Sequence, residues 1–288
     1  METGFNGQTL AVFTALAPAG AVAFLCLALF LGIRGRSLEE SQVVRLYRFI
    51  ALPLAAGWFG FIASATHLGT PANALYVALG VGRSPLSNEV ATTILFLLFA
   101  GVLWLVSFRE RPLRGLMRVL CVLCVAAAFA MLAFMSVAYN VESVPSWDTW
   151  HTPVNLLLTA LFSGCALGSY TLLLARIESR MFPKVLLWAS AAALVVGSVF
   201  LYIHMNFLTG VVNNETTAIA EVPWYPAAII GHILIGAVGL TIQYRGLDMR
   251  ITSTWRARVI GAFGLVLVLV SAVIVRLPFY EAYLSIGF

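Results

Sequence analysis

The sequence has few charged residues and lacks the motifs of several large enzyme classes. Only 10% of its 288 residues are charged, whereas 61% are hydrophobic, and the mean hydropathy is +0.96. A soluble domain of this length needs a far more charged surface. The chain also lacks a Walker loop, a nucleotide-binding glycine fingerprint and an H-E-x-x-H metal motif. These absences argue against a soluble enzyme and against the nucleotide-binding and metal-hydrolase classes that carry those motifs.

Cysteine is scarce as well, and its placement is typical of packing rather than chemistry. All four cysteines lie inside apolar runs: Cys26, Cys121, Cys124 and Cys165. The one C-x-x-C pair stands within VLCVLCVAAA, whereas an iron–sulfur cluster needs four thiolates. We therefore expect buried free thiols and no metal site in this chain.

Long apolar runs dominate what is present. Several reach the roughly 20 residues that cross a bilayer as a helix. Eight candidate spans can be counted, at about 9–33, 49–67, 89–108, 116–139, 153–175, 183–206, 223–243 and 259–280. The N-terminus lacks the basic region of a secretory signal, so the first run is expected to be a retained span. These runs predict an all-α integral membrane protein, a single transmembrane domain over residues 1–288 built as an eight-helix bundle.

The basic residues gather in alternate loops. All but two of the 17 lie in the segments 34–48, 109–118, 176–184 and 245–258; the exceptions are Arg83 and Arg276. Loops rich in Lys and Arg stay in the cytoplasm. This distribution places both termini on the opposite, outer (periplasmic) side.

The loops on the outer side have a different character. The segments 140–152 and 207–222 contain acidic residues and no Lys or Arg. The stretch 65–90, ATHLGTPANALYVALGVGRSPLSNEV, also lies on this side. Its central ALYVALGV is too short to span the bilayer, so we expect a short interfacial or re-entrant segment at 70–86.

All four histidines, His67, His151, His204 and His232, map to the outer half. An isolated histidine in a membrane helix is most often a packing residue, but four on one side favour a function, because ionisable groups are costly in lipid. His67 is the strongest candidate. It ends the second span near the membrane surface, and an imidazole takes up and releases protons near neutral pH.

Two further charged residues have two interpretations each. Glu89 either favours the start of the third span through the helix dipole, with Ser84-Pro85 or Ser87-Asn88 as the cap, or transfers protons. Arg276 either extends to the head groups or pairs with a carboxylate or a substrate oxygen.

The run GFIASATHLGTPANALYVALGVGRSPLSNEV (60–90) resembles the DmsC family, the membrane anchor subunits of dimethyl sulfoxide reductases. The match lies in G-F-I-A-S-x-x-H-L-G-[ST]-P and S-x-L-S-N-E. Weaker similarities extend along the chain at Phe13-Thr14, Tyr139-Asn140, Val222-Pro223 and Phe279-Tyr280. The sequence departs from the family in two places. Residues 136–138 are neutral, whereas members carry a basic residue there, and His232 aligns with an arginine.

The resemblance implies a multi-pass protein of the bacterial inner (cytoplasmic) membrane with eight transmembrane helices and no haem of its own. It implies oxidation of menaquinol and transfer of the electrons to an iron–sulfur subunit, which is docked with a molybdopterin catalytic subunit on the outer face. His67 and Glu89 match the family's quinol-site pair, and we expect them to handle the protons. Further candidates for the quinol pocket are Gly69, Pro71, Arg83, Asn88, Tyr139, His232 and Arg276.

Three alternatives remain open at this stage. A b-type cytochrome would use His204 and His232 as axial haem ligands. A purely structural anchor would leave the quinone site elsewhere in a complex. A secondary transporter would predict an internal repeat and midplane charges, and the sequence offers neither.

Overall fold

The computed structural model describes the chain except for residues 1–6, 67–72, 178, 180, 250–253 and 285–288. About 80% of it is helical, and the described part contains no strand beyond one isolated bridge between Val212 and Thr217. Eight helical segments there are long and apolar enough to cross a membrane. The predicted number of spans is therefore confirmed.

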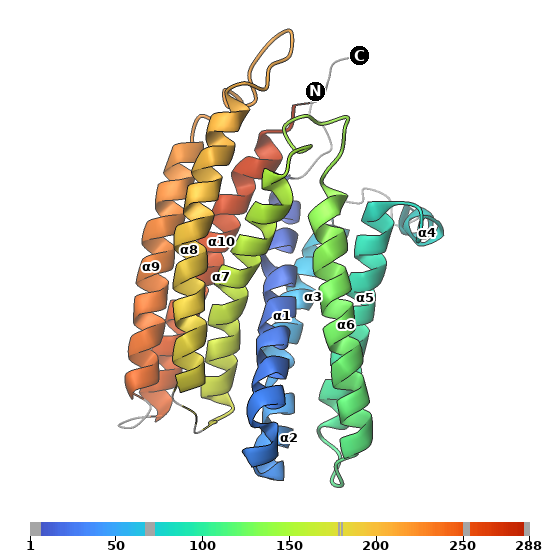
Figure 1. The fold of residues 1–288 in the computed structure, drawn as a ribbon, viewed down its shortest axis with the longest axis vertical. Coiled ribbons are helices and arrows are strands. Elements are labelled where there is room, and N and C mark those ends of the chain that lie inside the picture. Colours follow the sequence, from blue (N-terminus) through green and yellow to red (C-terminus); the bar gives the residue numbers. More distant parts are fainter. Residues whose placement is uncertain (1–6, 67–72, 178, 180, 250–253, 285–288) are drawn as a thin grey trace.

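The helices alternate in direction along the bundle. Their bounds are α1 Gly7–Arg34, η1 Gly35–Ser37, α2 Glu40–Phe49, α3 Ala51–Ala65, α4 Asn73–Leu79, α5 Pro85–Val106, α6 Arg114–Ala138, α7 His151–Leu174, α8 Met181–Leu208, α9 Tyr225–Met249 and α10 Thr254–Glu281. The start of α1 and the end of α10 lie at one end of the bundle, together with the segments 139–150 and 209–224 (Figure 1). We call this the loop end. The opposite, basic end carries α2 and the basic connections.

The second span is two helices with a break between them. Pro53 has no N–H, so the carbonyl of Phe49 cannot receive its helical hydrogen bond, and α2 ends there. The segment 34–48, expected to be a loop, is largely helical. Its helix α2 starts with a capping box in which Glu39 and Gln42 satisfy each other's backbone N–H groups.

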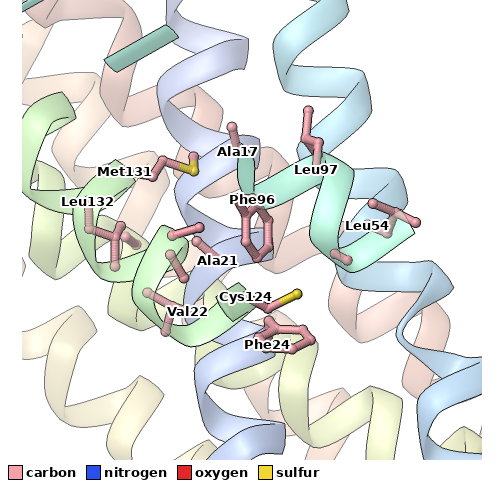
Figure 2. Close-up of a cluster of buried hydrophobic side chains, with 14 of the residues drawn as sticks. Ala17, Ala21, Val22, Phe24, Leu54, Phe96, Leu97, Cys124, Met131 and Leu132 are labelled. Carbon is pink, nitrogen blue, oxygen red and sulfur yellow. The ribbon is translucent and has the colours of Figure 1, made fainter. Parts of the chain in front are cut away.

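Helix α1 is the centre of the bundle and packs against α3, α6, α7 and α10. On one side its apolar face meets α5 and α6, as Figure 2 shows for Phe24, Phe96 and Cys124. The rings of Phe24 and Phe96 meet edge to face with their centroids 5.9 Å apart. Cys124, the buried half of the C-x-x-C pair, is thus a packing residue.

Glycines set the closest helix contacts. A Cβ at Gly164 in α7 would lie 2.5 Å from the Cβ of Val22, so the absence of a side chain at Gly164 lets α7 approach α1 closely. Between α9 and α10, a Cβ at Gly264 would lie 2.6 Å from the carbonyl oxygen of Gly239. The contact at Gly264 lets α10 pack closely against α9.

The short helix α4 lies beside the bundle at the loop end (Figure 1). Its Tyr76 and Leu79 are more than two thirds exposed. The interfacial position expected for 70–86 stays a prediction.

Candidate functional site

The Glu89 side chain is completely buried and has no hydrogen-bond partner among the residues that the structure describes. Helix α5 begins at Pro85, with Ser84 as the residue before it, so Glu89 is its fifth residue and lies beyond the first turn. Its side chain is 0% exposed, and neither carboxylate oxygen is hydrogen-bonded. The third span therefore starts at Ser84-Pro85, one of the two caps that the sequence offered and four residues before the expected start of the span. The alternative role of Glu89 as a first-turn helix residue is wrong.

Arg276 is buried at the loop end of α10, with 2% of its surface exposed. Its Nε donates a hydrogen bond to Oγ1 of Thr14 over 3.2 Å, and its guanidinium carbon lies 4.7 Å from the ring centre of Phe279. Its Nη2 is buried without a hydrogen-bond partner. Arg276 therefore does not extend to the head groups; its pairing with a carboxylate or a substrate oxygen stays a prediction.

Two tyrosines complete the group. Tyr139 follows the last residue of α6, and its ring meets that of Tyr280 edge to face, with the centroids 5.6 Å apart. The Tyr280 hydroxyl donates to Oγ1 of Thr14 over 3.0 Å. Glu89 is close enough to interact electrostatically with both Arg276 and Tyr139. We call Thr14, Glu89, Tyr139, Arg276 and Tyr280 the Glu89–Arg276 cluster.

The bundle topology explains why these residues meet. They come from the beginnings of α1 and α5 and from the ends of α6 and α10, which all lie at the loop end (Figure 1). Trp147 in the 139–150 segment donates from Nε1 to the carbonyl of Phe279 over 2.8 Å. The rings of Trp147 and Phe279 also stack, 5.3 Å apart. This contact holds the 139–150 segment against α10.

The chemistry of the cluster is that of an incomplete polar network. A carboxylate accepts protons and hydrogen bonds, whereas a guanidinium only donates them. Glu89 therefore offers two unused acceptors, and Arg276 one unused donor, in a buried setting. A bound hydroxyl compound would donate to Glu89 and accept from Arg276, whereas a carbonyl group would only accept from Arg276.

The other predicted pocket residues fall into two groups, those outside the described residues and those near the start of α5. His67, Gly69 and Pro71 are outside the described residues. Arg83 is exposed in the turn before α5. Asn88 stabilises that turn, because its Oδ1 accepts from the N–H of Gly82 over 2.6 Å, where the backbone has φ +82°.

His232 is also separate from the cluster. Its Nδ1 is 3.0 Å from the carbonyl oxygen of Ser271, to which it donates, and its ring meets Phe162 at 5.0 Å. Of the described candidates, the structure thus brings together Glu89, Tyr139 and Arg276.

Comparison with known proteins identifies the family to which this bundle belongs. The family model described as DMSO reductase anchor subunit (DmsC) matches residues 1–282. The chain belongs to this anchor-subunit family. It is a multi-pass membrane protein, and its resemblance to the family is confirmed over nearly its whole length.

Two proteins of Escherichia coli (strain K12) are similar to this anchor subunit over its full length. The C subunit of the anaerobic dimethyl sulfoxide reductase is 29% identical, and the anaerobic dimethyl sulfoxide reductase subunit YnfH is 25% identical; 98% of each relative is covered. The C subunit of the anaerobic dimethyl sulfoxide reductase of Haemophilus influenzae is 29% identical, over 60% of the present sequence and 61% of the relative.

The anchor subunit contains a second group of buried polar residues, and the sequence did not predict that they lie together. His151 and His204 lie with their ring centres 5.7 Å apart. Nδ1 of His151 shares a hydrogen bond of 2.7 Å with the Thr149 hydroxyl, and Nδ1 of His204 one of 3.0 Å with the Tyr225 hydroxyl. The sequence placed these histidines on one side, but their pairing depends on how α7 and α8 pack.

Residues suited to hold a metal ion are not gathered in the described part of the anchor subunit. No group of three or more His, Cys, Asp or Glu there could hold one. His204 and His232, proposed as haem ligands in one alternative, have different neighbours: Tyr225 for the first and Ser271 for the second.

Proposed function

We propose that this chain is the quinol-oxidising membrane anchor of an outer-facing molybdopterin reductase of the dimethyl sulfoxide reductase type. It takes two electrons from menaquinol, passes them to an iron–sulfur partner and has no redox centre of its own. The partners dock over the loop end, which faces the outer side of the bacterial inner membrane. The complex serves anaerobic respiration, in line with the names of the relatives.

The observation that carries this proposal is the buried and unsatisfied state of Glu89, which lies within electrostatic reach of Arg276. Burying a carboxylate away from water without hydrogen bonds costs roughly several kcal/mol. A purely structural anchor would gain nothing from a carboxylate buried in this way. A charged group kept inside the membrane domain is a functional group by default. The position at the loop end suits a lipid-soluble head group that must also reach a docked partner.

The cluster supports quinol oxidation in the following way. The quinol gives up two electrons and two protons. The Glu89 carboxylate accepts one hydroxyl proton as a general base, and His67 accepts the other. The Arg276 guanidinium stabilises the negative charge that develops on the quinol oxygen. Thr14 orients Arg276 through Nε, which leaves Nη2 for the substrate.

The test compares two electron donors in membranes that contain the complete complex. In Glu89→Gln, activity with a menaquinol analogue falls by about a hundredfold, the usual range for loss of a general base. Activity with a reduced viologen dye, which feeds electrons directly to the partner subunits, stays at the wild-type level.

His67→Ala behaves in the same way, whereas Glu110→Gln, an exposed carboxylate at the basic end, serves as the control and keeps both activities. Full quinol-dependent activity in Glu89→Gln would remove Glu89 from the mechanism. Full activity in both Glu89→Gln and His67→Ala would favour the purely structural anchor.

A further inference from the structure

A proton accepted by Glu89 has no direct contact with water. The side chain is 0% exposed, and a guanidinium such as that of Arg276 has no acceptor atom with which to receive a proton from it. Continued turnover therefore needs other groups that lead from the cluster to the surface. This reasoning rests on the proposed function, because it presupposes that quinol protons arrive at Glu89.

The His151–His204 pair has the properties of such a route. Both side chains are at least 95% buried, and the Nε2 atom of each is buried without a hydrogen-bond partner. Oδ1 of Asn155, one turn after His151 in α7, is likewise buried without one. In both histidines the other ring nitrogen is fixed by a hydroxyl that can donate or accept. An imidazole whose two nitrogens have separate partners can gain a proton on one side and lose it on the other.

The pair begins next to the Glu89–Arg276 cluster. The ring of His204 lies 6.3 Å from that of Phe279, the residue on which the Arg276 guanidinium rests. Arg276 is also close enough for its charge to act on both His204 and Tyr225. The other end of the pair leads to Thr149, whose neighbour Asp148 is exposed in the 139–150 segment.

We propose that Tyr225, His204 and His151 carry a proton from the Glu89–Arg276 cluster to the 139–150 segment. The quinol O–H bond breaks and a carboxyl O–H bond forms on Glu89, while the electrons pass to the iron–sulfur partner. The proton then passes from Glu89 over a bridging water to the Tyr225 hydroxyl and on to Nδ1 of His204, moves from Nε2 of His204 to His151, and leaves by way of Thr149. A water molecule between the unpartnered ring nitrogens and Asn155 completes the transfer.

Two other uses of the pair fit less well. A bound metal cation would lie near the positive charge of Arg276 and would find only two imidazoles and one amide oxygen. A second quinone head group would need space between rings that already touch: the His151 ring lies 4.0 Å from Trp150 and 5.3 Å from Phe207.

The test uses the assembled complex with His204→Gln, His151→Gln and Tyr225→Phe. We expect kcat with a menaquinol analogue to fall by about tenfold or more in the histidine variants, as for loss of a proton-transfer group. KM and photolabelling by a quinone analogue remain unchanged. The solvent deuterium isotope effect on kcat rises, and added imidazole restores part of the lost rate. Tyr225→Phe shows a smaller loss of the same kind.

The control is Phe207→Leu, which alters a ring that contacts both histidines but carries no proton. This variant keeps the wild-type kcat and isotope effect.

The proposal is overturned if both histidine variants keep the wild-type kcat, or if their losses come with lost photolabelling and no rescue by imidazole. An equal loss in Phe207→Leu would also overturn it, since packing would then explain the effect. If the wild-type complex neither oxidises quinol nor binds the photolabel, the proposed function fails and the relay with it. If the wild-type complex does both, a negative result removes the relay alone.

Discussion

Thr14→Val removes a side chain that joins Arg276 and Tyr280 to α1. The Thr14 hydroxyl is fully used: it donates to the carbonyl of Leu10 over 2.9 Å and accepts from Arg276 and Tyr280. Valine keeps the shape of threonine but takes away the acceptor of both donors in a buried site. Hydrogen bonds between membrane helices contribute about 0.6 kcal/mol on average and up to about 1.7 kcal/mol, so losing two costs roughly 1–3 kcal/mol of stability.

The effect of Thr14→Val on activity follows from the orientation of Arg276. Loss of about 1.4–2.8 kcal/mol of transition-state stabilisation lowers the rate about 10- to 100-fold. We expect this loss in the quinol-dependent activity only, together with a lower midpoint of thermal unfolding in detergent. Thr14→Ser keeps the hydroxyl and should retain activity. Wild-type activity in Thr14→Val, or an equal loss in Thr14→Ser, would refute the role assigned to the Thr14 hydroxyl.

Two further predictions concern packing and cofactor content. Gly264→Ala should destabilise the bundle by about 1–3 kcal/mol, because its Cβ would lie 2.6 Å from the Gly239 carbonyl oxygen. The control Gly101→Ala should leave stability unchanged, because a Cβ there would meet nothing within 4 Å. Thermal unfolding in detergent measures both variants, and equal midpoints would contradict the packing between α9 and α10. The purified protein should show no Soret absorption band, and a haem spectrum that disappears in His204→Gln would instead support the b-type cytochrome alternative.

Hydropathy and loop charge were enough to predict the bundle. Apolar runs give the number of spans, and the alternation of basic loops gives the arrangement in which α1 begins where α10 ends. The boundaries were less predictable. The third span starts at Pro85, which the possible Ser84-Pro85 cap indicated but the apolar run from 89 did not. The break at Pro53 with the helix α2 before it was not expected, because 34–48 is too polar to count as part of a span.

The site was predictable only in part. Glu89, Tyr139 and Arg276 could be named from their residue types and from the family resemblance. Thr14 could not be assigned a role, because its contact with Arg276 joins residues 262 positions apart. The His151–His204 pair had the same obstacle: each histidine is visible in the sequence, but the distance between them depends on the packing of α7 and α8.

The central claim is that quinol binds at the Glu89–Arg276 cluster. Photolabelling of the assembled complex with a menaquinone analogue, followed by mass-spectrometric mapping of the modified residues, tests it most directly. We expect labelled residues near the start of α5, the end of α6 and the end of α10, with labelling blocked by excess quinone. Labelling confined to the basic end of the bundle, or to the partner subunits, would contradict the claim.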